Sequence, residues 1–487
     1  MTAETKDDYG LMDARVLTGT AECADVIVIG GGSAGLSAAI AAREAGAEVL
    51  VLERGSGLSG TTTLAGGMLY LGGGTPVQKA NGFEDTPQAM LDYLMANTPE
   101  PDEEKLRLYC DESADHFAWL QAQDVPFTDG YYAPKHHTPP GTNCLSWSGN
   151  EKAWPISENA APAPRGHKVA HDTEGGALLI QTLGKKAESL GIRFLYDANV
   201  TNLIADDAGV VVGVRFTVFA EEHLASAARG VVLAAGAFSM NKEMVADLCP
   251  SLARFGIHRQ GNPNGDGAGI RMGIAAGGRA IHMEKAFVTA PFYPPESLIK
   301  AIFVNKDGER FINEDCYHAR TMDAAVSQPD GVVYLICDET TFGRPELQMQ
   351  KLIDAWETIE EMERALGLPT GKLQATIERY NGFAETGEDA DFHKHADWLA
   401  PIATAPFAAF QCSVGESYYV GFTLGGLDVS VDAEVLRENG EPIPGLYAAG
   451  ACASNIAQDG AGYSSGTCIG EATFFGRRGG RHAAGRD

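Results

Sequence analysis

Residues 25–54 read DVIVIGGGSAGLSAAIAAREAGAEVLVLER, two apolar runs separated by an alanine-rich segment. Residues 26–29 are a short apolar run of the kind found in buried strands. Residues 36–45 are rich in alanine, which favours a helix, and residues 49–52 form the second apolar run. Strand, helix and strand, with glycines at the first turn, predict a βαβ unit. We therefore expect an α/β protein with a Rossmann-like sheet.

The glycines at the first turn have the spacing GxGxxG. Gly30 permits the tight turn, Gly32 lets the backbone approach a pyrophosphate, and Gly35 lets the helix pack closely against the strand. The N-terminus of that helix offers free N–H groups to phosphates. Glu53 ends the second strand, where its carboxylate suits a ribose diol. These features predict a dinucleotide site rather than a purely structural glycine turn. The residues expected to contact the dinucleotide here are Gly30, Gly32, Ser33, Ala34, Gly35, Glu53 and Arg54.

Three further segments favour FAD over NAD as the dinucleotide. Residues 59–67 (SGTTTLAGG) combine small hydroxyl residues with glycines, and such a loop can pack against a bulky ring system. Residues 233–238 (LAAGAF) and 445–450 (GLYAAG) end apolar runs in small residues, as strands do when their carboxyl ends face a ligand. The expected FAD contacts therefore also include Thr61, Thr62, Thr63, Ala65, Gly66, Gly67, Val200, Ala235, Gly236, Gly450, Ala451, Gly466, Thr467 and Ile469.

Composition excludes several other classes of protein. The chain has 487 residues, 58 of them glycine, and a formal net charge of −28. So acidic a surface argues against nucleic acid and anionic membranes as partners. The 9 cysteines lack CxxC spacing, which predicts reduced thiols and no metal site. We find neither a secretory signal at the N-terminus nor a run of 18 apolar residues, and expect a cytoplasmic protein without a membrane span.

The middle of the chain differs in amino-acid composition from its two ends. Glycine thins out between residues 321 and 405, and residues 347–386 read as a polar helical stretch. Residues 301–313 (AIFVNKDGERFIN) read as a hairpin that turns at residues 306–308. We predict an FAD-binding domain split in sequence, residues 1–282 and 419–487, with an α+β cap domain inserted at residues 283–418.

These segments together resemble the flavoprotein family of fumarate reductases, succinate dehydrogenases and ketosteroid dehydrogenases. Residues 304–314 (VNKDGERFINE) look like the VNxxGxRFxNE cap motif of that family. The resemblance implies FAD, a dinucleotide fold and an inserted cap domain. Some members bind FAD covalently through a histidine just before the Gly-Gly pair. Residues 59–67 contain no histidine, so we expect non-covalent FAD.

The chain departs from the fumarate reductase pattern at three positions that handle carboxylates. The resemblance places a catalytic arginine about four residues after the cap motif, where this chain has His318. The family's HxTxGG motif begins here with Gly421 instead of histidine, and residues 460–470 contain no arginine. A dicarboxylate substrate would therefore leave its charge unmatched. We expect an uncharged substrate instead.

Hydroxyl groups stand in place of the lost charges, and they suit a neutral ketone. The arrangement looks like the 3-ketosteroid dehydrogenases of steroid degradation, a branch of lipid metabolism. Residues 463–467 (YSSGT) are most similar to the Δ4-(5α) type, which introduces the C4–C5 double bond. The resemblance implies Tyr317, Tyr463 and Ser465 as the catalytic group, with Ser465, assisted by Tyr317, accepting the C4 proton and Tyr463 donating to the C3 carbonyl.

Other functions stay open at this point. A Δ1-dehydrogenase, or a reductase of an activated C=C bond like fumarate reductase, uses the same cofactor. A flavin-binding protein without catalysis is a third interpretation, in which Tyr463 and its neighbouring serines form an ordinary loop and helix cap. No sequence feature identifies the electron acceptor.

Overall fold

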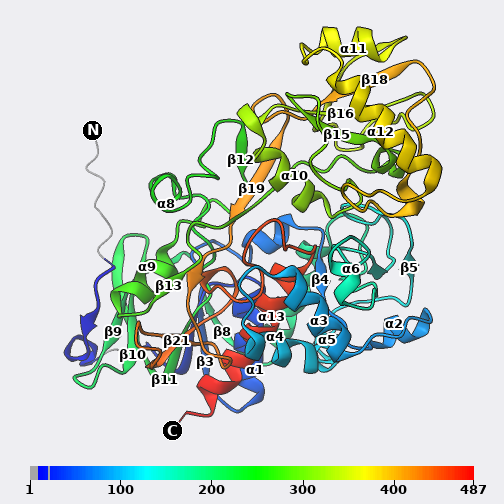
Figure 1. Cartoon of the computed structure of the whole chain (residues 1–487). Coiled ribbons are helices and arrows are strands. Elements are labelled where there is room, and N and C mark those ends of the chain that lie inside the picture. The colour runs from blue at the N-terminus through cyan, green and yellow to red at the C-terminus, as the bar shows by residue number, and fades with distance from the viewer. Residues whose placement is uncertain (1–8, 20–21, 487) are drawn as a thin grey trace.

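The computed structural model describes residues 9–19 and 22–486 (Figure 1). The N-terminal residues 1–8, which entered the expectation that no secretory signal is present, lie outside the described residues. Among the described residues, no helix is both long and apolar enough to cross a membrane. All 9 cysteines are free, as expected.

The largest sheet in the described part of the chain has nine strands and carries the predicted βαβ unit. Its order is β1-β9-β10-β11-β2-β3-β8, with β22 beside β11 and β21 beside β22. The strands β2, β3, β8, β11 and β22 run parallel to their neighbours in this group. The strands are β1 (Met12–Asp13), β2 (Glu22–Ile29), β3 (Val49–Leu52), β8 (Arg193–Leu195), β9 (Ala198–Ala205), β10 (Val211–Val218), β11 (Glu221–Leu233), β21 (Glu434–Leu436) and β22 (Pro442–Ala448). The α/β class with a Rossmann-like sheet is confirmed.

Two helices from opposite ends of the chain pack together beside this sheet. Helix α1 (Ser33–Glu44) follows β2, and α13 (Thr467–Ala484) closes the chain, with α7 (Gly175–Ser189) also against α1. A Cβ atom at Gly476 would lie 2.3 Å from the carbonyl oxygen of Ala34, and one at Gly480 would lie 2.1 Å from that of Ala38. Because only glycine permits such an approach, the two backbones lie in direct contact. The first turn of α13 is thereby brought to the GxGxxG turn.

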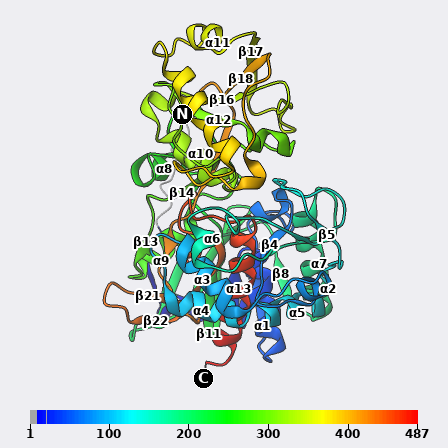
Figure 2. The same ribbon diagram turned by 45° about the vertical axis from the view of Figure 1, so that its right-hand side comes forward.

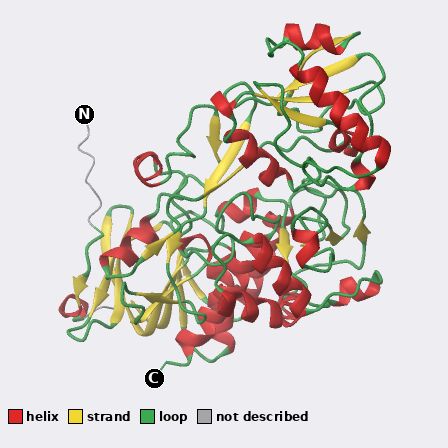
Figure 3. Cartoon of the chain, viewed as in Figure 1, coloured by secondary structure: helices red, strands yellow, loops and turns green. Residues whose placement is uncertain are grey.

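A second group of elements covers the side of α13 away from the nine-stranded sheet (Figures 1 and 3). It contains a four-stranded sheet of order β4-β7-β6-β5 and a set of short helices. The strands are β4 (Met68–Tyr70), β5 (Tyr131–Tyr132), β6 (Leu145–Ser146) and β7 (Gly166–Lys168). The helices are α2 (Pro76–Ala80), α3 (Pro87–Asn97), α4 (Glu103–Asp111), α5 (Ser113–Ala122) and α6 (Ile156–Asn159). The amide N–H of Tyr70 donates to the carbonyl of Gly466 at 3.0 Å, which ties β4 to the start of α13.

The third group stands above the other two in both views of the ribbon (Figures 1 and 2). Its four-stranded antiparallel sheet has the order β15-β16-β18-β17. Its elements are β15 (Ile302–Asn305), α10 (His318–Val326), β16 (Val333–Cys337), β17 (Lys351–Trp356), α11 (Ile359–Ala365), α12 (Lys372–Thr386) and β18 (Phe407–Gln411). This mixture of helices and strands agrees with the α+β cap expected there. The boundaries at residues 283 and 418 stay a prediction.

Short strands connect the cap to the nine-stranded part. In one sheet, β19 (Tyr419–Thr423) lies between β12 (Ile257–Arg259) and β14 (Ala286–Thr289), and in another β13 (Ala280–Ile281) pairs with β20 (Gly426–Leu427). Helix α8 (Lys242–Leu248) precedes β12, and α9 (Ala268–Ala275) lies between β12 and β13. The chain therefore enters and leaves the cap through paired strands rather than through a free linker.

Two local predictions in the cap need correction. The beginning of residues 347–386 is not helical, because β17 pairs with β18 as an edge strand; α11 and α12 supply the predicted helices. The turn of the predicted hairpin forms, with the Gly308 N–H donating to the Asn305 carbonyl at 3.0 Å. Its return arm is not a strand, since it makes one bridge between Val304 and Arg310 while β15 pairs with β16.

The close contact of α1 and α13 predicts a large effect of a single methyl group. We expect Gly480→Ala to lower the free energy of unfolding by about 1–3 kcal/mol, because its Cβ overlaps the Ala38 carbonyl. Gly382→Ala in α12 is the control, since its Cβ meets nothing within 4 Å. That change should raise stability by about 0.5–1 kcal/mol through helix propensity. Chemical denaturation measures both, and equal effects would contradict the packing.

Candidate active site

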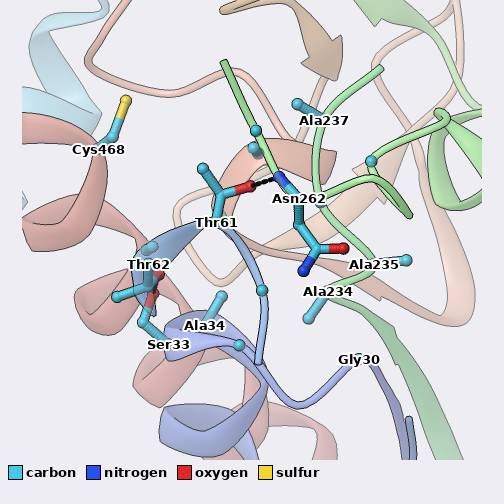
Figure 4. A pocket seen from close by; sticks show the side chains of 18 of the residues that line it. Gly30, Ser33, Ala34, Thr61, Thr62, Ala234, Ala235, Ala237, Asn262 and Cys468 are labelled. Atoms are coloured by element: carbon cyan, nitrogen blue, oxygen red, sulfur yellow. Dashed lines mark hydrogen bonds between the residues drawn. The ribbon is translucent and has the colours of Figure 1, made fainter. Parts of the chain in front are cut away.

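A cavity opens where the parallel strands of the nine-stranded sheet end. Its walls include Ile29 at the end of β2 and Leu52 at the end of β3, together with Ala234 after β11 and Ala449 after β22. Carboxyl ends of parallel strands are where ligands bind in sheets of this type. Residues 59–62, 65–66, 260–262 and 264–266 and the first turns of α13 also line the cavity (Figure 4).

The three glycines of the GxGxxG turn have the roles expected from their spacing. Gly30 has φ +104°, and a Cβ there would lie 2.4 Å from the Ala234 carbonyl oxygen. A Cβ at Gly35 would lie 1.9 Å from the carbonyl oxygen of Gly30. Gly32 instead faces the cavity, with nothing within 4 Å of an added Cβ, and it caps α1 without a side-chain hydrogen bond. The first turn of α1 thus borders the cavity with Gly32, Ser33 and Ala34, and a helix N-terminus of this kind suits the pyrophosphate of FAD.

Glu53 lies at the predicted place, at the end of β3 in the cavity wall. Its carboxylate accepts hydrogen bonds from the N–H groups of Gly31 at 2.6 Å and Gly55 at 2.7 Å. These bonds fix the carboxylate beside the GxGxxG turn. The next residue, Arg54, pairs with Asp266 at 2.6 Å across the cavity mouth.

The loop that follows β3 is tied to both sides of the cavity. The hydroxyl groups of Ser33 and Thr62 lie 2.9 Å apart, and the N–H of Asn262 donates to the Thr61 hydroxyl at 3.1 Å (Figure 4). Together these two bonds connect the first turn of α1 with residues 260–266. The cavity wall here includes the small residues Ala34, Ala235 and Ala237, so a flat ring system would meet little side-chain bulk (Figure 4).

The structure places most of the expected FAD contacts in the cavity wall and a few behind it. Those in the wall are Gly30, Gly32, Ser33, Ala34, Glu53, Arg54, Thr61, Thr62, Ala65, Gly66, Val200, Ala235, Gly236, Gly450, Ala451, Gly466 and Ile469. The remaining four lie behind the wall: Gly35, Thr63, Gly67 and Thr467. The Thr63 hydroxyl donates to the Gly60 carbonyl, and the Thr467 hydroxyl donates to the Ser464 carbonyl. A Cβ at Gly67 would lie 2.3 Å from the Gly175 backbone. Direct contact of each residue with FAD stays a prediction.

The proposed catalytic residues meet at one end of the cavity. Tyr463 and Ser465 lie in its wall, and Tyr317 lies directly behind them, with the two tyrosine rings 6.3 Å apart. Tyr463 also packs edge-on against Phe287 at 4.6 Å. Tyr317 and Tyr463 are only 5% and 7% exposed, so both hydroxyls are shielded from bulk water. The structure thus brings together three residues from the cap and the C-terminal segment.

Burial keeps both phenols protonated. It raises the pKa of Tyr317, while the neighbouring Ser465 hydroxyl opposes that rise. It likewise raises the pKa of Tyr463 well above 10.0, and the neighbouring Cys468 adds to that rise. Both phenols therefore remain O–H donors at neutral pH.

The cap motif fixes the segment that leads to Tyr317. Arg310 pairs at 3.0 Å with both Glu314 and Asp389, and Lys394 contacts Glu314 at 3.1 Å. The Glu314 carboxylate also accepts the N–H of Phe303 in β15 at 3.1 Å. Because these groups are buried, each charge needs its partners. The motif residues therefore anchor the chain just before Tyr317 rather than contact a substrate.

The positions that carry charge in fumarate reductases are neutral here. Burial lowers the pKa of His318 well below 6.5, and its Nδ1 shares a hydrogen bond with the Thr289 hydroxyl at 2.7 Å. A Cβ at Gly421 would lie 2.6 Å from the Phe287 carbonyl, so no histidine fits there. In the described part of the chain, Arg54 is the cation that lines the cavity, and Asp266 neutralises it.

A histidine pair outside the cavity has the residue types of a metal site, but its hydrogen bonds differ from those of metal-binding histidines. His136, His137 and Glu346 present ligand atoms within 4.8 Å of one another. Nδ1 of His136 accepts the Thr138 N–H at 3.1 Å, which leaves the proton on Nε2, 3.3 Å from Glu346. Metal-binding histidines donate from their second nitrogen instead. We interpret this contact as a hydrogen bond between the loop and the cap.

Sequence reasoning missed two groups of residues near the catalytic end. Residues 148–151 contact both Tyr317 and the C-terminal segment, although no motif marks them. Glu471, in α13, lines the cavity and accepts the N–H groups of Ile456 at 2.7 Å and Ala457 at 3.0 Å. Its position three residues after Cys468, on the same helix face, was the available signal.

Comparisons with known proteins agree with this geometry. The family model described as FAD binding domain matches residues 25–469. A solved 3-ketosteroid-Δ4-(5α)-dehydrogenase of Rhodococcus jostii RHA1, in complex with 4-androstene-3,17-dione, is 41% identical, with a TM-score of 0.92. The match covers 98% of this chain and 100% of that one. The fold and cavity therefore define an FAD-dependent flavoprotein.

Curated relatives extend the comparison to two kinds of enzyme. A 3-oxo-5-alpha-steroid 4-dehydrogenase of Comamonas testosteroni is 29% identical over 88% of this chain and 92% of its own length. A probable fumarate reductase of Shewanella frigidimarina is 28% identical over 98% of this chain and 77% of its own length. The chain belongs to the fumarate reductase and succinate dehydrogenase family of FAD-binding flavoproteins, and it is an FAD-dependent oxidoreductase that acts on CH–CH groups. The expected resemblance is confirmed.

The buried Glu471 predicts a dependence of stability on pH. Burial raises its pKa from 4.5 to about 7, against the opposing effect of its two backbone N–H donors and Lys105. A carboxyl group whose pKa is raised by folding stabilises the protein fully at pH values below its pKa in the unfolded chain. That contribution is lost as the pH rises through its pKa in the folded protein. From this group we expect stability to fall by about 3 kcal/mol between pH 4.5 and 7, since one pKa unit is worth about 1.4 kcal/mol.

Glu471→Gln should remove that part of the pH dependence, because glutamine keeps an acceptor oxygen and has no titration. Urea unfolding of the FAD-loaded protein at pH 5, 6, 7 and 8 measures it. Glu378→Gln, at an exposed position of α12, is the control and should follow the wild type. The assignment is wrong if Glu471→Gln and the wild type show the same slope.

Proposed function

We propose that this protein introduces the C4–C5 double bond into 5α-3-ketosteroids. The observation that carries the proposal is the convergence of Tyr463 and Ser465 in the cavity wall with Tyr317 directly behind them. All three offer neutral hydroxyls, which suit a ketone rather than a carboxylate. The sequence similarity to a Δ4-(5α)-dehydrogenase and to a steroid 4-dehydrogenase supports the position of the new bond.

The walls of the cavity also support an uncharged polycyclic substrate. Beside Tyr463 they carry Phe422 and Leu424, and Phe287 stacks on Phe422 at 4.7 Å. Burial of such apolar surface contributes roughly 25 cal/mol per Å². No cation in the described wall is free for a carboxylate, because Arg54 is paired with Asp266. A dicarboxylate would therefore lose its hydration without compensation.

The proposed reaction divides among the three hydroxyls. Tyr463 donates a hydrogen bond to the C3 carbonyl and stabilises the enolate that develops there. Ser465 accepts the C4 proton as it passes its own proton to Tyr317, which in the same relay releases its phenolic proton toward solvent. The C4–H bond electrons form the C4=C5 bond, and the C5 hydrogen leaves as hydride. FAD, when bound, supplies the acceptor for that hydride.

Regiochemistry tests the proposal against its alternatives. The protein, incubated with the C4–C5-saturated 5α counterpart of 4-androstene-3,17-dione and an artificial electron acceptor, should yield the 4-ene product. A new bond at C1–C2 would identify a Δ1-dehydrogenase. Reduction of an enone by the chemically reduced enzyme, without the forward reaction, would identify a reductase. Absence of flavin bleaching in anaerobic mixtures with either substrate would leave a non-catalytic flavoprotein.

Replacement of one hydroxyl tests the assigned roles. Tyr463→Phe should lower turnover at least about tenfold without releasing FAD, because the ring packing against Phe287 stays while the donor to the carbonyl is lost. The measurements are steady-state turnover and the flavin absorbance of the purified protein. Tyr418→Phe, at a half-exposed position that does not line the cavity, is the control. Unchanged turnover of Tyr463→Phe would remove this tyrosine from the mechanism.

A further inference from the structure

One buried asparagine, Asn150, contacts the segments that carry the proposed catalytic hydroxyls. Its Oδ1 accepts the backbone N–H of Tyr317 at 2.8 Å. Its Nδ2 donates to Asn97 Oδ1 at 3.1 Å and to the carbonyl of Ala461 at 3.4 Å, two residues before Tyr463. The residue is 1% exposed and does not line the cavity. A single carboxamide therefore connects the cap, helix α3 and the C-terminal segment.

The backbone around Asn150 makes a second set of contacts with the same segment. The N–H of Asn150 donates to the Tyr93 hydroxyl at 2.9 Å, and that hydroxyl lies 2.6 Å from Ser464 Oγ. The N–H of Ser465 donates to the Ser148 carbonyl at 2.7 Å. A Cβ at Gly149 would lie 2.3 Å from Ser464 Oγ. The position of Ser465 thus depends directly on residues 148–150.

The hydrogen bond from the Tyr317 N–H to Asn150 pairs a backbone donor that helix α10 leaves without an acceptor. Tyr317 is the N-cap of α10, so its N–H lies outside the hydrogen-bond ladder of the helix. Because the residue is buried, an N–H without an acceptor would be costly. Asn150 supplies that acceptor from the other side of the boundary between the cap and the rest of the chain.

We propose that Asn150 is a positioning residue that sets the distance between Tyr317 and Ser465. This inference rests on the proposed function. A proton passes from Ser465 to Tyr317 only when their oxygens lie about 2.6–3.2 Å apart. Asn150 fixes Tyr317 by its side-chain oxygen and residues 461–465 by its side-chain nitrogen and its neighbours. Loss of the carboxamide separates the two hydroxyls without removing either of them.

The test measures the rate at which the 5α-3-ketosteroid reduces the flavin of Asn150→Ala and of the wild type, by anaerobic stopped-flow absorbance. We expect the limiting rate constant to fall about 10- to 100-fold, because a misplacement of about 1 Å is worth up to about 10²-fold. The apparent Kd for the steroid and the FAD content should stay close to those of the wild type, since Asn150 does not line the cavity.

A deuterium isotope effect distinguishes positioning from general damage. With substrate deuterated at C4, the isotope effect on flavin reduction should be larger for Asn150→Ala than for the wild type, because proton removal becomes the slower event. A merely structural loss lowers the amount of active enzyme and leaves the isotope effect unchanged. Asn159→Ala is the matched control, since Asn159 is exposed and its side chain donates only to the Pro155 carbonyl within the described part of the chain.

Asn97→Ala is a second, milder variant that keeps the proposal testable should Asn150→Ala not fold. It removes one partner of Asn150 and the donor to the Gly462 carbonyl while leaving the Tyr317 contact intact. A three- to tenfold lower rate with a raised isotope effect is expected, as about 1 kcal/mol corresponds to roughly fivefold. If the wild type reacts and the variants have the same rate constant or the same isotope effect as the wild type, the inference about Asn150 is wrong while the proposed function stands. If the wild type does not react, the proposed function fails and the inference with it.

Discussion

The direct backbone contact between α1 and α13 is the constraint on which the site depends. Gly476 and Gly480 place α13 against the carbonyls of Ala34 and Ala38, closer than any other residue would allow. The dinucleotide turn at the start of α1 and the hydroxyl residues just before α13 consequently share one cavity. Without that contact, Tyr463 and Ser465 would not share a cavity with the dinucleotide turn. The high glycine content of the chain is thus partly a requirement of helix packing and partly one of ligand access.

The cap contributes through buried polar contacts. Arg310, Glu314 and Asp389 anchor the segment before Tyr317, and Asn150 accepts the N–H of Tyr317 itself. These charges are paired within the cap, and in the described part of the chain no cation lines the cavity beside Tyr463 and Ser465. The same family fold can therefore serve carboxylates in one member and a ketone in another, because the difference lies in a few side chains around a shared cofactor position.

Local patterns predicted those parts of the structure that neighbouring residues determine. The GxGxxG turn, β2, α1 and β3 follow from 30 consecutive residues, and the small residues at the ends of β11 and β22 mark the cavity. The roles of Tyr317, Tyr463 and Ser465 came from family resemblance. Asn150 was not predictable, since it acts on Tyr317, 167 positions away in the sequence, through a contact that only the folded chain creates. The strand β17 was read as helix because its pairing with β18, and not its own sequence, determines its conformation.

The central claim is that Ser465 and Tyr317 act on C4 while Tyr463 binds the C3 carbonyl. A crystal structure of the FAD-loaded protein with a 3-ketosteroid tests it most directly. The account predicts C4 within about 3–3.5 Å of Ser465 Oγ, the distance of a reactive pair, and the C3 oxygen within hydrogen-bonding distance of the Tyr463 hydroxyl. A steroid bound with C1 or C2 facing Ser465, or with its carbonyl turned away from Tyr463, would contradict the account.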